Sequence, residues 1–203
     1  SMNMNTLIDS TIDDKAASHF LPAIRFAIVS IVLFGLLYPV LATYTGKLLF
    51  PQQANGSLIL RDGKAIGSSL VAQNFVSDGY FQSRPSAAIF DPRALAGSNL
   101  APSNPALRER ISEASKTITA RENIAANSIP VDMVTASGSG IDPHISLEAA
   151  KVQVARVAKA RGLTVMQVEA AINANSQVPT FGILGQARVN VLKLNMALDA
   201  ITP

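Results

Sequence analysis

The hydropathy pattern is dominated by one long apolar run near the N-terminus. Residues 26–46, FAIVSIVLFGLLYPVLATYTG, contain no charged side chain. As a helix that rises about 1.5 Å per residue, this run is about 32 Å long, enough to cross a hydrocarbon core about 30 Å thick. A secretory signal core is usually shorter, about 7–15 residues, and a membrane span tolerates Pro39. The pattern therefore predicts a transmembrane helix over residues 24–46, and the competing interpretation is a buried core helix.

The chain after this run, residues 47–203, alternates apolar segments with turn residues, as a folded domain does. Two short strands on either side of Asp62-Gly63 predict a β-hairpin, because this dipeptide favours a two-residue turn. The following stretch, residues 75–105, is rich in Gly, Pro, Ser and Asn. A long irregular stretch inside a compact domain usually binds a partner or serves a function. Its candidate docking loops contain Arg84, Ser98, Asn99 and Asn104.

Three helices are predicted from the residues that begin and end them. Small polar residues cap a helix N-terminus, proline suits its first position, and glycine ends it. A Thr with a Gln three positions later forms a capping box. The predicted caps are Asn104 before Pro105, Ser146 before residues 147–161 with Gly162 after them, and Thr164 with Gln167 before a helix that ends near residue 175.

The remaining segments predict strands and turns. VDMVTA, residues 131–136, predicts a short strand, and FGILGQ, residues 181–186, predicts a turn. The period of residues 188–201 is ambiguous, since Val189 and Val191 fit a strand whereas later apolar positions fit a helix. Helices and strands are mixed without a repeated βαβ pattern. The sequence therefore predicts the class α+β, with one N-terminal transmembrane helix followed by a single mixed α+β soluble domain.

The composition excludes several kinds of binding and catalytic site. The chain has no cysteine, which excludes disulfides and thiolate metal sites, and its two histidines do not make a multi-histidine site. The formal net charge is +3, and the basic residues are scattered rather than clustered. A nucleic-acid binder needs a basic patch, so we expect no nucleic-acid partner. We also expect no metal site and no tightly bound cofactor.

The sharpest local feature is TASGSGIDPHIS, residues 135–146. One interpretation is a loop that binds a nucleotide or a partner through free amides and hydroxyls. The candidate residues are Ser137, Gly138, Ser139, Gly140, Asp142 and His144. The other interpretation is a strand-to-helix turn in which the glycines supply positive φ angles. The residues alone favour the turn.

The same residues bear on enzyme activity. Asp142 and His144 beside a serine resemble a hydrolase triad, and a membrane-anchored extracytoplasmic hydrolase with a Ser/Asp/His site is the alternative function. Residues two positions apart on one loop rarely form a triad, and the sequence contains no G-x-S-x-G motif. It also lacks a P-loop and the phosphorylation loop of a P-type pump. We expect no catalytic residue in this chain and no ATP hydrolysis by it.

A succession of motifs resembles one protein family. After the apolar helix the chain contains, in this order, YFQSRPSA, GSNLAPSNP, VTASGSGIDPHIS, QVARVAKARGL and RVNVLKLN. The succession resembles the C subunit of the bacterial Kdp potassium-transporting ATPase, over residues 24–198. The departures are a longer N-terminal tail and the residues Ala101 and Ala187 within two of the motifs.

The resemblance implies a non-catalytic accessory subunit of an ATP-driven potassium uptake complex in the bacterial inner membrane. Its partners would be a channel-like potassium-binding subunit, a P-type ATPase catalytic subunit, a small single-helix subunit and membrane lipid. It also implies that the tail, residues 1–23, lies in the cytoplasm and the soluble domain, residues 47–203, in the periplasm.

Two mechanisms are attached to this family, and they conflict physically. In one, the subunit is a catalytic chaperone that raises the ATP affinity of the ATPase subunit in a transient ternary complex with ATP. In the other, it is needed for assembly and stability of the pump. The membrane separates a periplasmic domain from cytoplasmic ATP, so we expect the assembly role.

Overall fold

The computed structural model describes residues 20–91, 93–94, 97–179 and 185–201. The chain divides into two compact units, residues 1–56 and residues 57–203. Most of the predicted N-terminal tail and most of the predicted turn at residues 181–186 lie outside the described residues.

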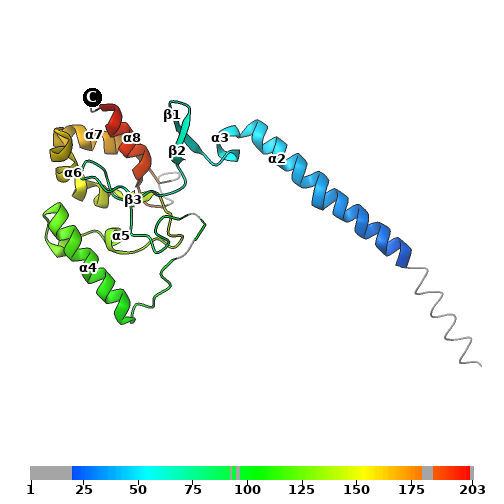
Figure 1. Cartoon of the computed structure of the whole chain (residues 1–203), viewed down its shortest axis with the longest axis horizontal. Helices are drawn as coiled ribbons and strands as arrows, with labels where there is room; N and C mark the ends of the chain where they lie inside the picture. The colour runs from blue at the N-terminus through cyan, green and yellow to red at the C-terminus, as the bar shows by residue number, and fades with distance from the viewer. Residues whose placement is uncertain (1–19, 92, 95–96, 180–184, 202–203) are drawn as a thin grey trace, which may run out of the picture. The chain divides into compact units, whose positions relative to one another are not determined.

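The first unit contains one long helix, Phe20–Leu49 (Figure 1). Its 30 residues have a mean hydropathy of 2.3 in the most apolar window, and none of that window is buried. At about 1.5 Å per residue the helix is about 45 Å long, more than a hydrocarbon core needs. The predicted apolar helix is confirmed, and it extends past Arg25 and Lys47 at its two ends. A core helix of a soluble domain would be buried, so the structure favours a helix that could span a membrane.

The hydrogen-bonding pattern in the middle of this helix changes just before Pro39. Residues Ile31–Leu37 form a π-helical segment, η1, which continues into α2, Tyr38–Leu49. The N–H of Tyr38 donates to the carbonyl of Leu33, five residues back. Proline has no N–H, and its ring collides with the carbonyl four residues earlier in an ordinary α-helix. A wider turn before the proline relieves that collision without ending the helix. A short helix, α3 (Pro51–Ala54), follows.

The second unit begins with the predicted hairpin. Strands β1 (Leu58–Arg61) and β2 (Lys64–Ser68) pair antiparallel, with Arg61 opposite Lys64. The two turn residues between them, Asp62 and Gly63, have φ angles of 51° and 74°. Positive φ at both positions is the geometry that favours an Asp-Gly turn, so the hairpin prediction is confirmed.

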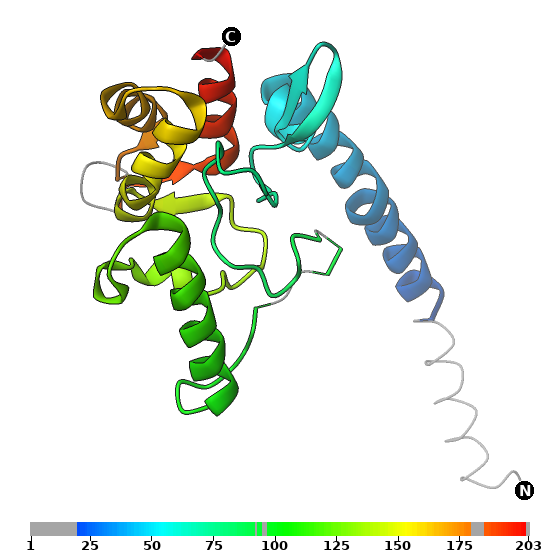
Figure 2. The ribbon, with the colours of Figure 1, turned by 60° about the vertical axis from the view of Figure 1, so that its left-hand side comes forward.

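A three-stranded antiparallel sheet and three helices form the centre of this unit (Figures 1 and 2). The strand order is β3–β5–β4, from β3 (His144–Ser146), β5 (Arg188–Asn190) and β4 (Ser176–Gln177). Helices α6 (Leu147–Arg161), α7 (Val165–Asn175) and α8 (Val191–Ile201) pack on the sheet and on one another. The fully buried side chains include Val157, Val168, Val189, Leu194 and Leu198.

The predicted helix caps are confirmed. The side chain of Asn104 accepts the Ala106 N–H at the start of α4, Pro105–Glu122. Ser146 accepts the N–H of Ala149, and Gly162 ends α6 with a φ of 65°. The capping box before α7 is complete on both sides, between Thr164 and Gln167.

One segment differs from the sequence prediction, and the structure settles the ambiguous period of another. The predicted strand at residues 131–136 is wrong, because Val131–Val134 forms one helical turn, α5, after the 3-10 turn η2 (Ala126–Ser128). Pro130 begins this turn, and the N–H of Met133 donates to its carbonyl. A buried Met133 holds the turn against the core, and this packing overrides the β propensity of the valines. The ambiguous residues 188–201 contain both elements, first β5 and then α8.

A long extended segment crosses the helices. None of the described residues between 69 and 104 lies in a helix or strand, yet Phe81 has no exposed surface. The Phe81 N–H donates to the Asn195 side chain at 2.8 Å, and the Asn195 amide donates back to the Phe81 carbonyl at 3.0 Å. Gln153 makes the same two-way contact with Gln82, at 2.8 and 3.3 Å. Side-chain amides on α6 and α8 thus make the backbone hydrogen bonds that a neighbouring strand would otherwise make.

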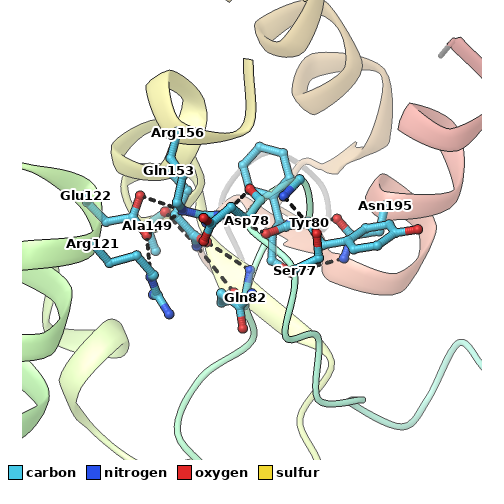
Figure 3. A network of polar contacts seen from close by, with 12 residues as sticks. Ser77, Asp78, Tyr80, Gln82, Arg121, Glu122, Ala149, Gln153, Arg156 and Asn195 are labelled. Atoms are coloured by element: carbon cyan, nitrogen blue, oxygen red, sulfur yellow. Dashed lines mark hydrogen bonds and ion pairs between the residues drawn. The ribbon is translucent and has the colours of Figure 1, made fainter. Parts of the chain in front are cut away.

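A buried ion pair lies beside these amides (Figure 3). Nε of Arg156 lies 3.0 Å from both carboxylate oxygens of Glu122, and the exposed fractions of the two side chains are 7% and 0%. The same guanidinium donates to the carbonyls of Asp78 and Tyr80 and, at 2.8 Å, to Gln153. One side chain on α6 therefore joins the end of α4 to the extended segment.

We predict that Arg156→Met lowers the free energy of unfolding by about 3 kcal/mol, because it leaves the buried Glu122 carboxylate with Arg121 as its one remaining ion-pair partner among the described residues. The double variant Glu122→Leu/Arg156→Met should lose less than the sum of the two single variants, since it removes the buried charge as well. Denaturant unfolding of the purified chain in detergent measures both. Additive losses would contradict this account of the pair.

Candidate functional site

The loop at residues 137–142 is held by its own hydrogen bonds. The N–H of Ser137 donates to the Pro85 carbonyl, and the N–H of Gly140 donates to the Ser137 carbonyl, each at 3.3 Å. The N–H of Ile141 donates to the Ser139 hydroxyl at 3.3 Å. Gly140 has a φ of 77°, which glycine adopts without strain. Ser137 is buried, whereas Gly138 and Ser139 are exposed.

Arg84 and His144 hold the acidic end of this loop. Oδ1 of Asp142 accepts the backbone N–H of His144 at 3.0 Å and lies 3.3 Å from its ring Nδ1. Oδ2 of Asp142 lies 3.6 Å from the Arg84 guanidinium. The hydrogen bond from the His144 ring is the largest cause that lowers the pKa of Asp142, and the Arg84 charge adds to it. Asp142 is therefore an anion at neutral pH.

Three residues of the stretch before α4, Arg84, Ser86 and Ala72, bond to the loop or to the two residues before it. Arg84 donates to the Thr135 and Ala136 carbonyls, at 3.5 and 3.3 Å. The hydroxyl of Ser86 donates to the Gly140 carbonyl. The Ala72 N–H donates to the Ile141 carbonyl at 2.8 Å. Part of the irregular stretch before α4 thus holds this loop.

The glycine of GSNLAPSNP, Gly97, lies against the loop. A Cβ added to Gly97 would lie 2.8 Å from the Gly138 carbonyl oxygen. The predicted docking residues Ser98 and Asn99 follow Gly97, and Asn99 is exposed. Asn104 instead caps α4 with its side chain. The structure therefore brings the predicted docking residue Arg84 to the 137–142 loop. Ser98 and Asn99 follow a glycine that lies against this loop. Asn104 only caps α4.

A groove of about 990 Å³ lies beside the loop. Its polar wall contains Arg84, Asp132, Asp142, His144 and Ser146. Its rim contains Val131 and Val178, whose exposed fractions are 72% and 80%.

The edge of the sheet beside the groove is closed to strand addition. β3 is an outer strand, and its His144 and Ser146 N–H groups donate to the carboxylates of Asp142 and Asp132. The Asp132 bond to Ser146 N is 2.8 Å long, and a second bond joins the two side chains at 3.0 Å. An edge whose donors are already used does not pair with another strand. The β3 edge of the groove is therefore not available for pairing with a strand of a ligand.

The site does not assemble a serine hydrolase. Ser137 is buried, and the Ser139 hydroxyl accepts the Ile141 N–H. The His144 ring faces Asp142, and among the described residues no hydrogen bond joins a serine to this ring. A triad needs the imidazole to bridge the acid and the nucleophile. The geometry thus gives no support to the hydrolase alternative.

The sequence did not predict the buried polar groups of the domain. Gln153, Glu122, Asn190 and Asn195 are buried on helix and strand faces that otherwise contact the core. Their signal in the sequence is a polar residue within an apolar stripe, such as Asn195 between Leu194 and Leu198. A pattern analysis treats such a residue as a break in the stripe, whereas the structure uses it to bind the extended segment.

The fold and the groove define a class of protein, a small α+β domain that follows one apolar helix long enough to span a membrane. Comparisons with known proteins define the family. Residues 20–200 match the family described as the c chain of the K⁺-transporting ATPase, KdpC. A potassium-transporting ATPase KdpC subunit from Shewanella putrefaciens is 50% identical over 198 residues, which cover 98% of each chain.

Relatives with the same name occur in other bacteria. The Polaromonas naphthalenivorans protein is 49% identical over 90% of this chain and 94% of its own. The Xanthomonas campestris protein is 52% identical over 86% of this chain and 84% of its own. The chain therefore belongs to the KdpC family, the C subunits of the Kdp potassium-transporting ATPase.

We predict that Gly97→Ala lowers the free energy of unfolding by about 1–3 kcal/mol, because the new methyl group would collide with the Gly138 backbone. Gly138→Ala is the matched control, since a Cβ there meets no atom within 4 Å. Thermal unfolding of the two variants beside the wild type measures the difference. Equal stability of both variants would show that the two segments are not in contact.

Proposed function

We propose that this chain is a non-catalytic accessory subunit that assembles and stabilises the Kdp pump. The apolar helix would anchor it in the inner membrane with its N-terminus in the cytoplasm, and the α+β domain would lie in the periplasm. Its partners would be the channel-like potassium-binding subunit, the P-type ATPase subunit and the small single-helix subunit. Family membership supports a place for the chain in this complex. The geometry of the 137–142 loop supports a docking role for it there.

The observation that carries the proposal is how this loop uses its polar groups. The amides of Ser137, Gly140 and Ile141 all donate within the domain, so they are not free to converge on a ligand. Gly138 and Ser139 nevertheless stay exposed at the tip. A loop fixed before binding loses little conformational entropy when a partner covers it. These properties suit a preformed docking surface.

The catalytic chaperone role with ATP is the weaker candidate. A phosphate-binding loop needs several free N–H groups that point at the anion, usually with a nearby cation. Here the neighbouring Asp142 is an anion, and its Arg84 partner is already bound to it and to backbone carbonyls. The repulsion between Asp142 and a triphosphate disfavours a transient ternary complex with ATP at this loop.

The test is to express the pump with and without this chain and to purify it through a tag on the channel-like subunit. We expect the ATPase subunit to be lost from the purified complex when the chain is absent, and to return when the full-length chain is supplied from a second plasmid. Residues 1–56 alone provide a matched control for the contribution of the helix. A complex without the chain that is recovered in normal yield and transports potassium with normal affinity would refute the proposal.

A further inference from the structure

Two buried polar atoms of the extended segment have no partner within the domain. The Ser83 hydroxyl and Nε of Arg84 have almost no exposed surface, and no group of the described residues forms a hydrogen bond with either atom. The terminal nitrogens of Arg84, in contrast, are engaged by Asp142 and by the carbonyls before the loop. Buried polar groups nearly always bond to the protein or to ordered water, because an unpaired one costs free energy.

Both atoms belong to residues that line one small cavity. Its volume is about 20 Å³, and its polar wall includes Ser83, Arg84, Arg121 and Asp132. A single water molecule needs about 10–15 Å³ of such space and two to four polar partners. The cavity meets both conditions, whereas an organic ligand needs a far larger site.

Asp132 adds an acceptor to this wall. Its two carboxylate oxygens each accept one hydrogen bond from Ser146, at 2.8 and 3.0 Å, and a carboxylate oxygen has lone pairs for a second. The cavity thus offers a guanidinium N–H that donates, a hydroxyl that donates or accepts, and a carboxylate that accepts. Water has both donors and acceptors and so suits all three kinds of group.

The charges around the cavity favour a neutral ligand over an ion. Arg84 is paired with Asp142 at 3.6 Å, and Arg121 is paired with the buried Glu122 at 2.8 Å. Asp132 is the third charged residue on the wall. An anion would lie beside the Asp132 carboxylate, and a cation would lie beside two guanidinium groups.

We infer that this cavity binds one water molecule as a fixed part of the fold. The water accepts the Arg84 Nε–H, bonds to the Ser83 hydroxyl and donates to the Asp132 carboxylate. It thereby links the extended segment to α5, which contains Asp132. Arg84, Asp132 and Ile145 also line the 990 Å³ groove, so the water lies directly behind the groove wall. The inference concerns the chain by itself and does not depend on the proposed function.

The test removes one partner of the water. Thermal unfolding of the full-length chain in detergent is compared for the wild type and Ser83→Ala. If the hydroxyl is bonded to water, its loss removes a hydrogen bond, and we expect the unfolding temperature to fall by about 2–4 °C. If the hydroxyl is unpaired, its removal relieves a desolvation cost and the temperature rises. A rise or an unchanged temperature contradicts the inference.

Thr119 on α4 provides the matched control. Its hydroxyl is also buried without a partner among the described residues, but Thr119 does not line this cavity. Thr119→Val keeps the shape of the side chain, and we expect the unfolding temperature to stay the same or rise. An equal fall in both variants would show that the loss at Ser83 does not report a specific water, and would refute the site.

Two further measurements identify the ligand. A crystal structure of the full-length chain, at a resolution that shows ordered water, should contain one peak within hydrogen-bond distance of both Ser83 Oγ and Arg84 Nε; featureless density there refutes the inference. The wild type should unfold at the same temperature in sodium chloride and in sodium gluconate of equal ionic strength. A stabilisation by chloride that Ser83→Ala abolishes would assign the cavity to an anion instead of water.

Discussion

The contact between Arg156 and the buried carboxylate of Glu122 joins three segments of the second unit, and the extended segment depends on it. Arg156 joins α4 to α6 through this ion pair, and its remaining N–H groups donate to carbonyls of the extended segment at Asp78 and Tyr80. Desolvating two charges costs free energy, which is offset only where geometry and further hydrogen bonds are good. Gln153 and Asn195 complete the set by pairing with the backbone of the next residues. These contacts hold a segment without helix or strand against the helices (Figure 3), and its Phe81 is part of the buried core.

Contacts with that segment fix the conformation of the candidate site, the 137–142 loop. Arg84, Pro85 and Ser86 lie further along the same segment, and all three contact the 137–142 loop or the two residues before it. The ion pair thus orders the extended segment, and the extended segment orders the loop. The result is a surface of preset shape whose polar atoms are mostly engaged within the domain. Such a surface suits binding to a protein partner better than chemistry on a small molecule.

Local rules predicted the parts of the fold that depend on neighbours in sequence. Asn104, Ser146 and Thr164 cap their helices as expected, and Asp62-Gly63 forms the hairpin turn, because a few adjacent residues determine these structures. The turn at Val131–Val134 was mispredicted because distant packing at Met133 decides it. The contacts of Arg84 with Asp142 and of Gly97 with Gly138 join residues about 40 or more positions apart, and no local pattern encodes such pairings.

The most direct test of the account concerns the side of the membrane on which the loop tip lies. The chain has no cysteine, so Ser139→Cys introduces a single thiol at an exposed position. A membrane-impermeant maleimide is applied to intact cells, with Ser10→Cys in the N-terminal tail as the matched control. The account predicts labelling of Cys at position 139 in intact cells and labelling at position 10 only after permeabilisation. The reverse pattern would place the loop with cytoplasmic ATP and contradict the docking role.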